Sequence, residues 1–259
     1  MSPEQIVHIA RERGVRAIAI TDHDAIAGIE PARRTGASLG VEVINGVELS
    51  ALCDDTEVHL LGYFFDPGCP PIRTLLDQLR ADRMERARQI VRRLNKLGFK
   101  IPFDLILRKM NDGVICRPLI ADVLVEEGIV FSAHEAFEKY LGDSRPANVP
   151  KKARSPDSIV RTLHEAGGLA FLAHPAVGLS SQVLSRVLDS GLDGIEIYHP
   201  DHTAGDRMRF NAMAVERGLL TSGGSDCHGG RGGQIRLGSM TVPYTLLEAM
   251  KTRIAESNA

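Results

Sequence analysis

The segment Gly224-Ser225-Asp226-Cys227-His228-Gly229 follows an apolar run and a glycine-rich turn, and it indicates where the functional end of the fold lies. Its position predicts that Asp226 and His228 lie just beyond the end of a strand. An extended backbone points residues i and i+2 to the same side, so this carboxylate and imidazole would face one point, as metal ligands do. For such a segment taken alone, a local turn capped by the aspartate is the commoner explanation.

Apolar runs that alternate with helical patterns surround this segment on the N-terminal side. The first helix has a Ser2-Pro3 start with Gln5 as the capping-box partner, and Gly14 ends it. The pattern predicts further helices near 30–39, 155–166, 180–189 and 205–217. It predicts strands near 15–20, 41–50, 58–65, 169–173, 194–198 and 219–224. Such alternation is typical of α/β folds with parallel strands.

The pattern changes between residues 66 and 154. Prolines 67, 70 and 71 interrupt the chain, and a long helical periodicity follows as far as Leu97. Shorter helical patterns continue to Tyr140, and we find no strand pattern of comparable quality in this region. We therefore predict a barrel domain from residues 1–65 and 155–259, and a helical insertion domain from residues 66–154.

The long helix of the insertion carries a row of basic residues opposite its apolar face. A charged row of this kind is usually a solvated helix surface. The functional alternative is an electrostatic lip for a phosphorylated substrate. The row consists of Arg80, Arg83, Arg86, Arg88, Arg92, Arg93 and Lys96.

Histidines and carboxylates recur at or near the predicted strand ends. Each has a structural alternative, because Glu48 could face solvent from its strand and His59 could be a core or edge residue. Loops at the carboxyl ends of parallel strands converge on one face, however, which favours a common site. A mixed imidazole and carboxylate set suits zinc, manganese or iron. The set is His23, Glu48, His59, His174, Asp226 and His228.

The overall composition restricts the class of protein. The net charge of −2 argues against a global polycation for nucleic acid, and 43% hydrophobic and 25% charged residues are ordinary for a soluble globular protein. The four scattered cysteines suit reduced thiols better than disulfides. We find neither an apolar run of membrane-spanning length nor a signal-peptide pattern, so we expect a cytoplasmic protein with no membrane partner.

Five motifs in order resemble those of the PHP (polymerase and histidinol phosphatase) metallo-phosphoesterases. They are Ile20-Thr21-Asp22-His23-Asp24, Gly46-Val47-Glu48-Leu49-Ser50, His59-Leu60-Leu61-Gly62, Ala173-His174-Pro175 and the segment quoted first. The helical insertion with Arg117-Pro118, together with residues 196–202, is similar to the TrpH/RNase AM-like branch of 3',5'-nucleoside bisphosphate phosphatases. The resemblance covers nearly the whole chain.

This resemblance implies a distorted (β/α)7 barrel that holds two or three divalent ions, manganese first and zinc or iron as alternatives. In the family pattern Glu48 bridges two ions and His59 and His174 complete one of them. Asp226 belongs to a second ion, and His23 and His228 belong to a third. The reaction implied is hydrolysis of a phosphate ester by metal-activated water, on a 3',5'-bisphosphorylated nucleoside or the 5' end of a short RNA.

Three further residues are candidates for roles around the substrate. His199 or His202 could protonate the leaving oxygen, and each could equally be a helix cap or a partner of a metal ligand. Arg117 could clamp a substrate phosphate because a guanidinium matches two oxygens at once, with a surface or inter-helix ion pair as the alternative.

Two departures from the family pattern bear on activity. The family begins with a strand that carries a His-x-His pair and a nearby aspartate, and the sequence shows none before Ser2-Pro3, so we expect a barrel that lacks its first strand. Leu119 stands where the family tends to have histidine after Arg-Pro. We therefore keep as alternatives an inactive PHP-fold module that binds metal or regulates, and a histidinol-phosphate phosphatase.

Overall fold

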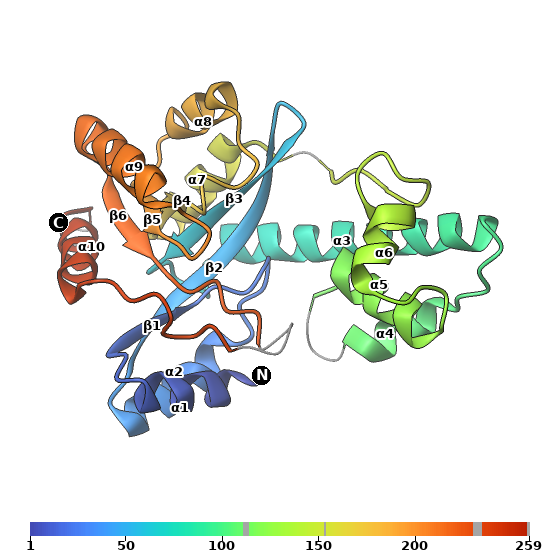
Figure 1. The fold of residues 1–259 in the computed structure, drawn as a ribbon. Coiled ribbons are helices and arrows are strands. Elements are labelled where there is room, and N and C mark those ends of the chain that lie inside the picture. The colour runs from blue at the N-terminus through green and yellow to red at the C-terminus, as the bar shows by residue number, and fades with distance from the viewer. Residues whose placement is uncertain (111–113, 153, 230–234, 258–259) are drawn as a thin grey trace. The chain divides into compact units, whose positions relative to one another are not determined.

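A computed structural model describes residues 1–110, 114–152, 154–229 and 235–257. The chain divides into two compact units, one formed by Met1–Leu75 with Ala153–Ala259 and the other by Leu76–Lys152. The first unit contains the sheet and the second is helical (Figure 1). In the described part of the chain, none of the helices combines the length and apolarity that a membrane crossing requires.

The first unit is built on a curled, open sheet of six strands whose spatial order equals their sequence order (Figure 1). The pairs β1–β2, β4–β5 and β5–β6 are parallel, whereas β3 is antiparallel to both of its neighbours. The sheet is therefore mixed, and not parallel throughout. The strands are β1 (Ala17–Ile20), β2 (Glu42–Cys53), β3 (Thr56–Tyr63), β4 (Leu169–Leu172), β5 (Gly194–Tyr198) and β6 (Leu220–Gly223).

The antiparallel pair β2–β3 is a hairpin closed by two residues. Asp54 and Asp55 both have positive φ, 48° and 60°, between the paired residues Cys53 and Thr56. Two consecutive left-handed residues give the turn whose twist matches that of the flanking strands, and aspartate tolerates this conformation better than most residues. The hairpin brings the histidine of β3 to the face of β2 that carries Glu48.

Helices connect and cover the strands. The capping box predicted for α1 is present, since Ser2 Oγ accepts from Gln5 N at 3.3 Å and Ser2 N donates to Gln5 Oε1 at 2.8 Å. The last helix, α10, had no predicted counterpart, and its Met250 packs against Leu61 and Phe171 of the sheet. The helices of this unit are α1 (Pro3–Glu12), α2 (Ile29–Leu39), α7 (Pro156–Glu165), α8 (Ser181–Leu188), α9 (Ala204–Arg217) and α10 (Tyr244–Ser257).

The centre of the sheet is tightly packed. Every residue of β4 is buried, and Phe171 is fully enclosed. Gly194 at the start of β5 allows this packing, because a Cβ at that position would lie 2.1 Å from Phe171 Cε1. These strands are therefore held rigidly, which fixes the positions at which their carboxyl ends emerge.

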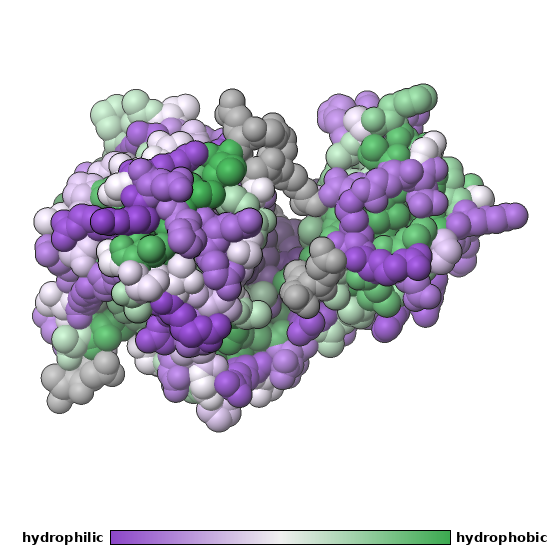
Figure 2. Space-filling model, turned by 90° about the horizontal axis from the view of Figure 1, so that it is seen from below, coloured by the Kyte–Doolittle hydropathy of each residue, from purple (hydrophilic) through white to green (hydrophobic). Residues whose placement is uncertain are grey.

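The second unit has its own apolar core, in which Leu94, Ile106, Ile120 and Leu124 are almost completely buried. Hydrophilic residues cover much of the face of each unit seen in Figure 2, with hydrophobic areas between them. The helices of this region are α3 (Pro70–Lys96), α4 (Phe103–Met110), α5 (Arg117–Glu126), α6 (Ala133–Ala136) and a π-helical turn, η1 (Phe137–Leu141).

Candidate metal centre

His23 is placed beside Glu48 by backbone hydrogen bonds. After β1 ends, Asp24 N donates to Glu48 O at 2.8 Å, and Glu48 N donates to Asp22 O at 3.2 Å. His23 and Glu48 thereby form an isolated parallel bridge. The predicted location of His23 just beyond a strand is confirmed, and the partner that fixes it is the middle of β2.

His59 reaches Glu48 through the register of the hairpin. Ser50 pairs with His59, and Glu48 pairs with Leu61. Because side chains alternate along a strand, residues 48 and 50 share one face, and His59 is the diagonal neighbour of Glu48 on that face. Both residues lie within their strands, as the apolar runs around them predicted.

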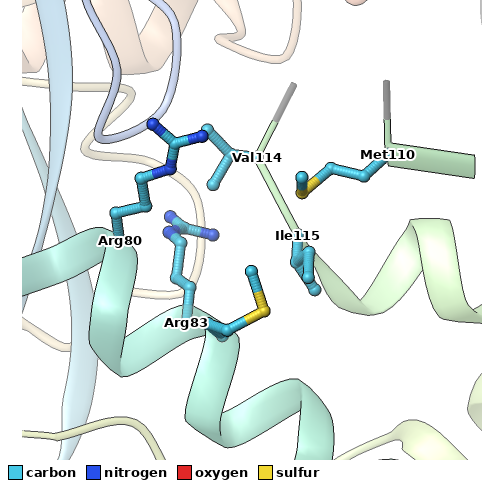
Figure 3. A pocket seen from close by; sticks show the side chains of 6 residues that line it. Arg80, Arg83, Met110, Val114 and Ile115 are labelled. Atoms are coloured by element: carbon cyan, nitrogen blue, oxygen red, sulfur yellow. The ribbon is translucent and has the colours of Figure 1, made fainter. Parts of the chain in front are cut away.

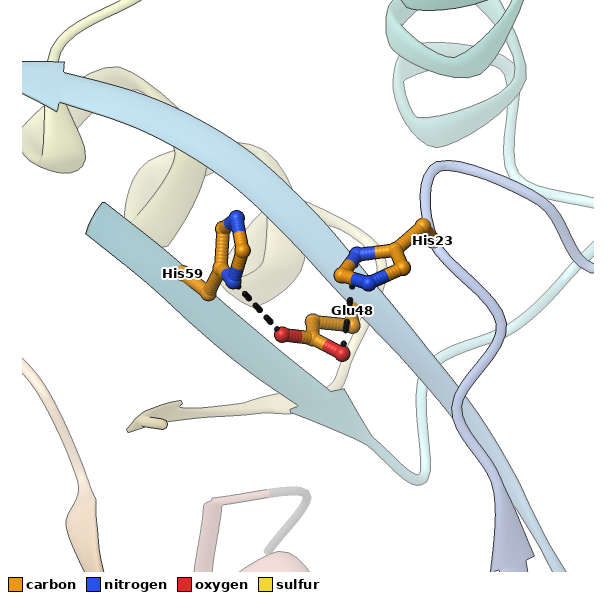
Figure 4. A group of neighbouring side chains, drawn as sticks. All are labelled: His23, Glu48 and His59. Carbon is orange, nitrogen blue, oxygen red and sulfur yellow. Dashed lines mark ion pairs between the residues drawn. The ribbon is translucent and has the colours of Figure 1, made fainter. Parts of the chain in front are cut away.

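The donor atoms of three side chains converge at this point (Figure 4). Glu48 Oε1 lies 2.8 Å from His59 Nδ1, and Glu48 Oε2 lies 3.6 Å from His23 Nδ1. One donor atom from each of His23, Glu48 and His59 lies within 4.8 Å of the others. Glu48 is 6% exposed, so the carboxylate faces the imidazoles in a largely desolvated setting.

The charges of this group support one another. Burial favours the neutral form of Glu48, but hydrogen bonds with His174 and His59 hold the pKa of its carboxyl well below the usual range. Burial also disfavours the charged form of His59, but hydrogen bonds with Glu48 and Glu57 raise the pKa of its imidazole to about 9. Without a metal, a proton on His59 therefore balances the buried carboxylate.

His174 joins the group from the end of β4. Its Nε2 lies 3.2 Å from Glu48 Oε1 and 3.2 Å from His59 Nδ1. The backbone of His174 has a φ of 28°, an uncommon value for a residue other than glycine. Its N–H donates to Glu196 Oε2 at 2.8 Å. Burial raises the pKa of Glu196 to about 7.

Asp226 and His228 follow β6 in a turn. Asp226 has a φ of 45°, so the extended backbone predicted there is wrong. The two side chains still meet, because His228 Nδ1 lies 3.6 Å from Asp226 Oδ1 and 2.9 Å from the Asp226 carbonyl oxygen. The ring of His228 is 6.1 Å from that of His23, centroid to centroid, which connects this pair to the group around Glu48.

His199 lies beside Asp226 from the end of β5. Its side chain is 2% exposed, and its Nε2 is 3.6 Å from Asp226 Oδ2. The N–H of Asp201 donates to His199 Nδ1 at 3.1 Å. Burial disfavours the charged form of His199, but the Asp226 carboxylate outweighs this effect and raises the pKa of the ring. The His199 ring is 5.6 Å from that of His174, so it borders the group on this side.

His202 lies beside His199. Its ring is 5.2 Å from His199 and 5.3 Å from Phe210. Its Nδ1 is 2.8 Å from the Ile197 carbonyl oxygen, and the N–H of Ala176 lies 3.5 Å from its Nε2. Both ring nitrogens therefore face backbone groups, and burial lowers the pKa of the imidazole.

Arg117 begins α5 in the helical unit. Its Nη1 donates to Asp143 Oδ1 at 2.9 Å and to the Leu141 carbonyl oxygen at 3.3 Å. The guanidinium also lies 5.8 Å from the centre of the Phe137 ring. The ion pair weighed as the structural alternative is present, and the predicted role of Arg117 in binding substrate phosphate stays a prediction.

The basic row of α3 is divided between two environments. Arg86 Nε donates to the Val149 carbonyl oxygen at 2.6 Å, and Arg93 contacts the Asn148 carbonyl, so these two arginines hold the end of the insertion to the helix. Arg80 and Arg83 instead line a small pocket together with Val114 (Figure 3). The remaining lining residues are Met84, Met110 and Ile115.

Two carboxylates contact the candidate ligands and received no role in the sequence analysis. Glu57 Oε1 lies 2.7 Å from His59 Nε2, and Glu196 accepts the N–H of His174. Glu57 precedes His59 by two residues in one strand, which puts both on one face. Glu196 is an acid between Ile195 and Ile197, the same signal that singled out Glu48. Both could have been found from the sequence.

The donor set fits a divalent first-row cation. It combines an ionised carboxylate with imidazole nitrogens, and these ligand types accept zinc, manganese and iron. Glu57 against the second nitrogen of His59 provides the carboxylate partner that commonly orients a histidine ligand. Proton and cation compete for this site, because His59 binds a metal only after it loses its proton.

Comparison with known proteins identifies the family. The family model of the PHP domain matches residues 1–127. A 5'-3' exoribonuclease of Haemophilus influenzae is 33% identical over 233 residues, which cover 88% of this chain and 85% of the relative. A 3',5'-nucleoside bisphosphate phosphatase of Chromobacterium violaceum is 33% identical over 241 residues, which cover 90% of this chain and 85% of the relative.

A solved structure agrees with these matches. A protein of Bifidobacterium adolescentis, described as a metal-dependent phosphoesterase, superimposes with a TM-score of 0.86 at 30% identity, over 97% of this chain and 91% of that one. The sequence relatives, the shared fold and the histidine and glutamate group point the same way. This chain belongs to the PHP domain family of metal-dependent phosphoesterases.

Proposed function

We propose that this chain hydrolyses phosphate esters of nucleotides, with a 3',5'-nucleoside bisphosphate or the 5' end of a short RNA as substrate. The observation that carries the proposal is the convergence of His23, Glu48 and His59 within 4.8 Å, with His174 adjoining them. The relatives named above act on these two substrate types by their descriptions, at 33% identity over most of the chain.

The residues divide into three groups of ligands. We assign Glu48, His59 and His174 as residues that would hold one ion, with Glu48 also available to a second. We assign Asp226 to the second ion, and His23 and His228 to a third. In this assignment the curled sheet is part of a distorted (β/α)7 barrel. The positions of the rings, linked from His228 through His23 and His59 to His174, support the assignment.

The ligands form a site suited to phosphate ester hydrolysis. Divalent ions, manganese in our assignment and zinc or iron as alternatives, supply an activated water and neutralise charge on the phosphoryl oxygens. The protein's part is to hold Glu48 ionised, and a bound ion would displace the proton that His59 carries in the metal-free protein. Glu57 orients His59, and the backbone bonds of residues 22–24 fix His23 against β2.

His199 and His202 stay the predicted donors of the proton that the leaving oxygen needs. A test that separates this role from a structural one compares two substrates for each of His199→Asn and His202→Asn. A nitrophenyl leaving group needs no proton, whereas a nucleoside oxygen does. If the replaced histidine is the donor, kcat of the variant on the nucleotide should fall by roughly 10²- to 10⁴-fold. Its kcat on the nitrophenyl ester should fall far less. Equal losses on both substrates would exclude this role for that residue.

The direct test is phosphate release from adenosine 3',5'-bisphosphate and from a 5'-phosphorylated oligoribonucleotide. Activity should disappear when metal is stripped with EDTA and return with manganese. Glu48→Gln should be inactive at every metal concentration, while a surface variant such as Glu256→Gln should match the unchanged protein.

Two other functions give different results in the same assay. A histidinol-phosphate phosphatase would release phosphate from histidinol phosphate and leave both nucleotide substrates intact. An inactive module that binds metal would bind manganese in calorimetry and hydrolyse none of the three substrates. Either result would reject the proposed activity.

A further inference from the structure

We propose that Glu196 is a positioning residue of the metal centre, and that it acts by fixing the backbone of His174. The inference rests on the proposed metal-binding role of His174. Glu196 is 6% exposed and lies in β5 between the buried residues Ile195 and Ile197. A carboxylate placed so deeply requires a partner that compensates for its desolvation.

The partner is the N–H of His174, which donates to Glu196 Oε2 at 2.8 Å. The strand register explains the contact. Leu172 of β4 pairs with Ile195 of β5, so the next residue of β5 lies beside the point where β4 ends and the chain turns. The Glu196 carboxylate therefore lies next to the N–H group of His174, which follows the last residue pair between β4 and β5.

The bond acts on a strained position. His174 has a φ of 28°, outside the regions that side chains other than glycine prefer, and such conformations persist only where the surroundings hold them. This turn directs Nε2 to within 3.2 Å of both Glu48 Oε1 and His59 Nδ1. Without the acceptor, the backbone at residue 174 would relax and the imidazole would leave that position.

The second oxygen of Glu196 borders the neighbouring strand end. A Cβ built on Gly224 would lie 3.8 Å from Glu196 Oε1, so the carboxylate lies against the segment that leads from β6 to Asp226. Strand β5 lies between β4 and β6 (Figure 1). Glu196 of β5 thus contacts the segments that follow both neighbours and lead to His174 and Asp226. A change in its length would disturb both.

Two substitutions separate the reach of the side chain from its charge. Glu196→Gln keeps an oxygen at the same distance and removes the charge. Glu196→Asp keeps the charge and withdraws the oxygen by about 1.5 Å, one carbon–carbon bond. Ile195→Val, which thins the buried packing of the same strand and keeps the Glu196 carboxylate, is the matched control for general loss of packing.

The measurements are manganese affinity by calorimetry and the environment of His174 by NMR in the metal-free protein. We expect Glu196→Gln and Ile195→Val to bind manganese within a few-fold of the unchanged protein, and Glu196→Asp to bind roughly 10- to 100-fold more weakly. In Glu196→Asp the His174 amide signal should shift, and the contact between the His174 and His59 rings should weaken. In Glu196→Gln the amide signal and the ring contact should both stay close to those of the unchanged protein.

The reverse order would overturn the inference, since loss in Glu196→Gln with full affinity in Glu196→Asp would mean that charge matters and reach does not. Unchanged His174 signals in Glu196→Asp would also overturn it. The NMR result is independent of metal. If the unchanged protein binds no manganese, the proposed function fails, and the His174 signals still decide the role of Glu196.

Discussion

Glu48→Gln should destabilise the metal-free protein near neutral pH and have almost no effect on its stability in alkali. The structural reason is the pair of short contacts around His59, whose Nδ1 lies 2.8 Å from Glu48 Oε1 and whose Nε2 lies 2.7 Å from Glu57 Oε1. Burial works against the charged ring, but these carboxylates raise the pKa of His59 from 6.5 to about 9.

The sign of the effect follows from this upward shift. The folded protein keeps a proton on His59 that the unfolded chain gives up, so the stabilisation is complete below the unfolded pKa of 6.5 and is lost as the pH rises through about 9. The linkage therefore gives on the order of 2 to 3 kcal/mol at pH 7 and almost nothing at pH 10. Glu57 shares this energy, so we expect Glu48→Gln to cost about 1 to 2 kcal/mol at pH 7.

The assay is urea unfolding in EDTA at the two pH values for the unchanged protein and the variant. Glutamine retains the shape of the side chain and one hydrogen bond. The difference in the free energy of unfolding between the unchanged protein and Glu48→Gln therefore reports the effect of the charge. Glu57→Gln is the matched control, and it should show the same loss with pH at a smaller size because Glu57 is more exposed. If Glu48→Gln costs the same free energy at both pH values, the electrostatic reasoning is wrong and Glu48 acts by packing.

Three further predictions concern packing, substrate and metal. Gly194→Ala should lower the free energy of unfolding by about 1 to 3 kcal/mol in urea titration, because its Cβ would lie 2.1 Å from Phe171 Cε1; an unchanged midpoint would show that the ring can move aside. Arg117→Lys should raise KM for a nucleotide several-fold with little change in kcat, and Arg117→Ala more so; equal effects in Asp143→Asn would assign the loss to the broken ion pair. Manganese at about 100 times its Kd should add about 2.7 kcal/mol of stability and raise the Tm by several degrees, and Glu48→Gln should abolish that rise.

The sequence by itself determined the elements whose signals are local. The capping box of Ser2 and Gln5, the βα alternation and the helical character of the insertion follow from neighbouring residues, and the structure has all three. The types of ligand could also be predicted from the sequence, because burying a histidine or glutamate side chain inside an apolar strand costs free energy unless it has a partner. The same reasoning would have found Glu196. The apolar spacing of Leu246, Met250 and Ile254 would have found α10.

Only the tertiary structure decided how these residues meet. The antiparallel register of β2 and β3 makes His59 the diagonal neighbour of Glu48, and a one-residue slip would turn its ring to the opposite face. The positive φ values of His174 and Asp226 are likewise invisible in the sequence, since their own preferences favour other conformations. Long-range contacts such as the Glu196 carboxylate on the His174 N–H oppose those preferences, and such contacts exist only once the strands are paired.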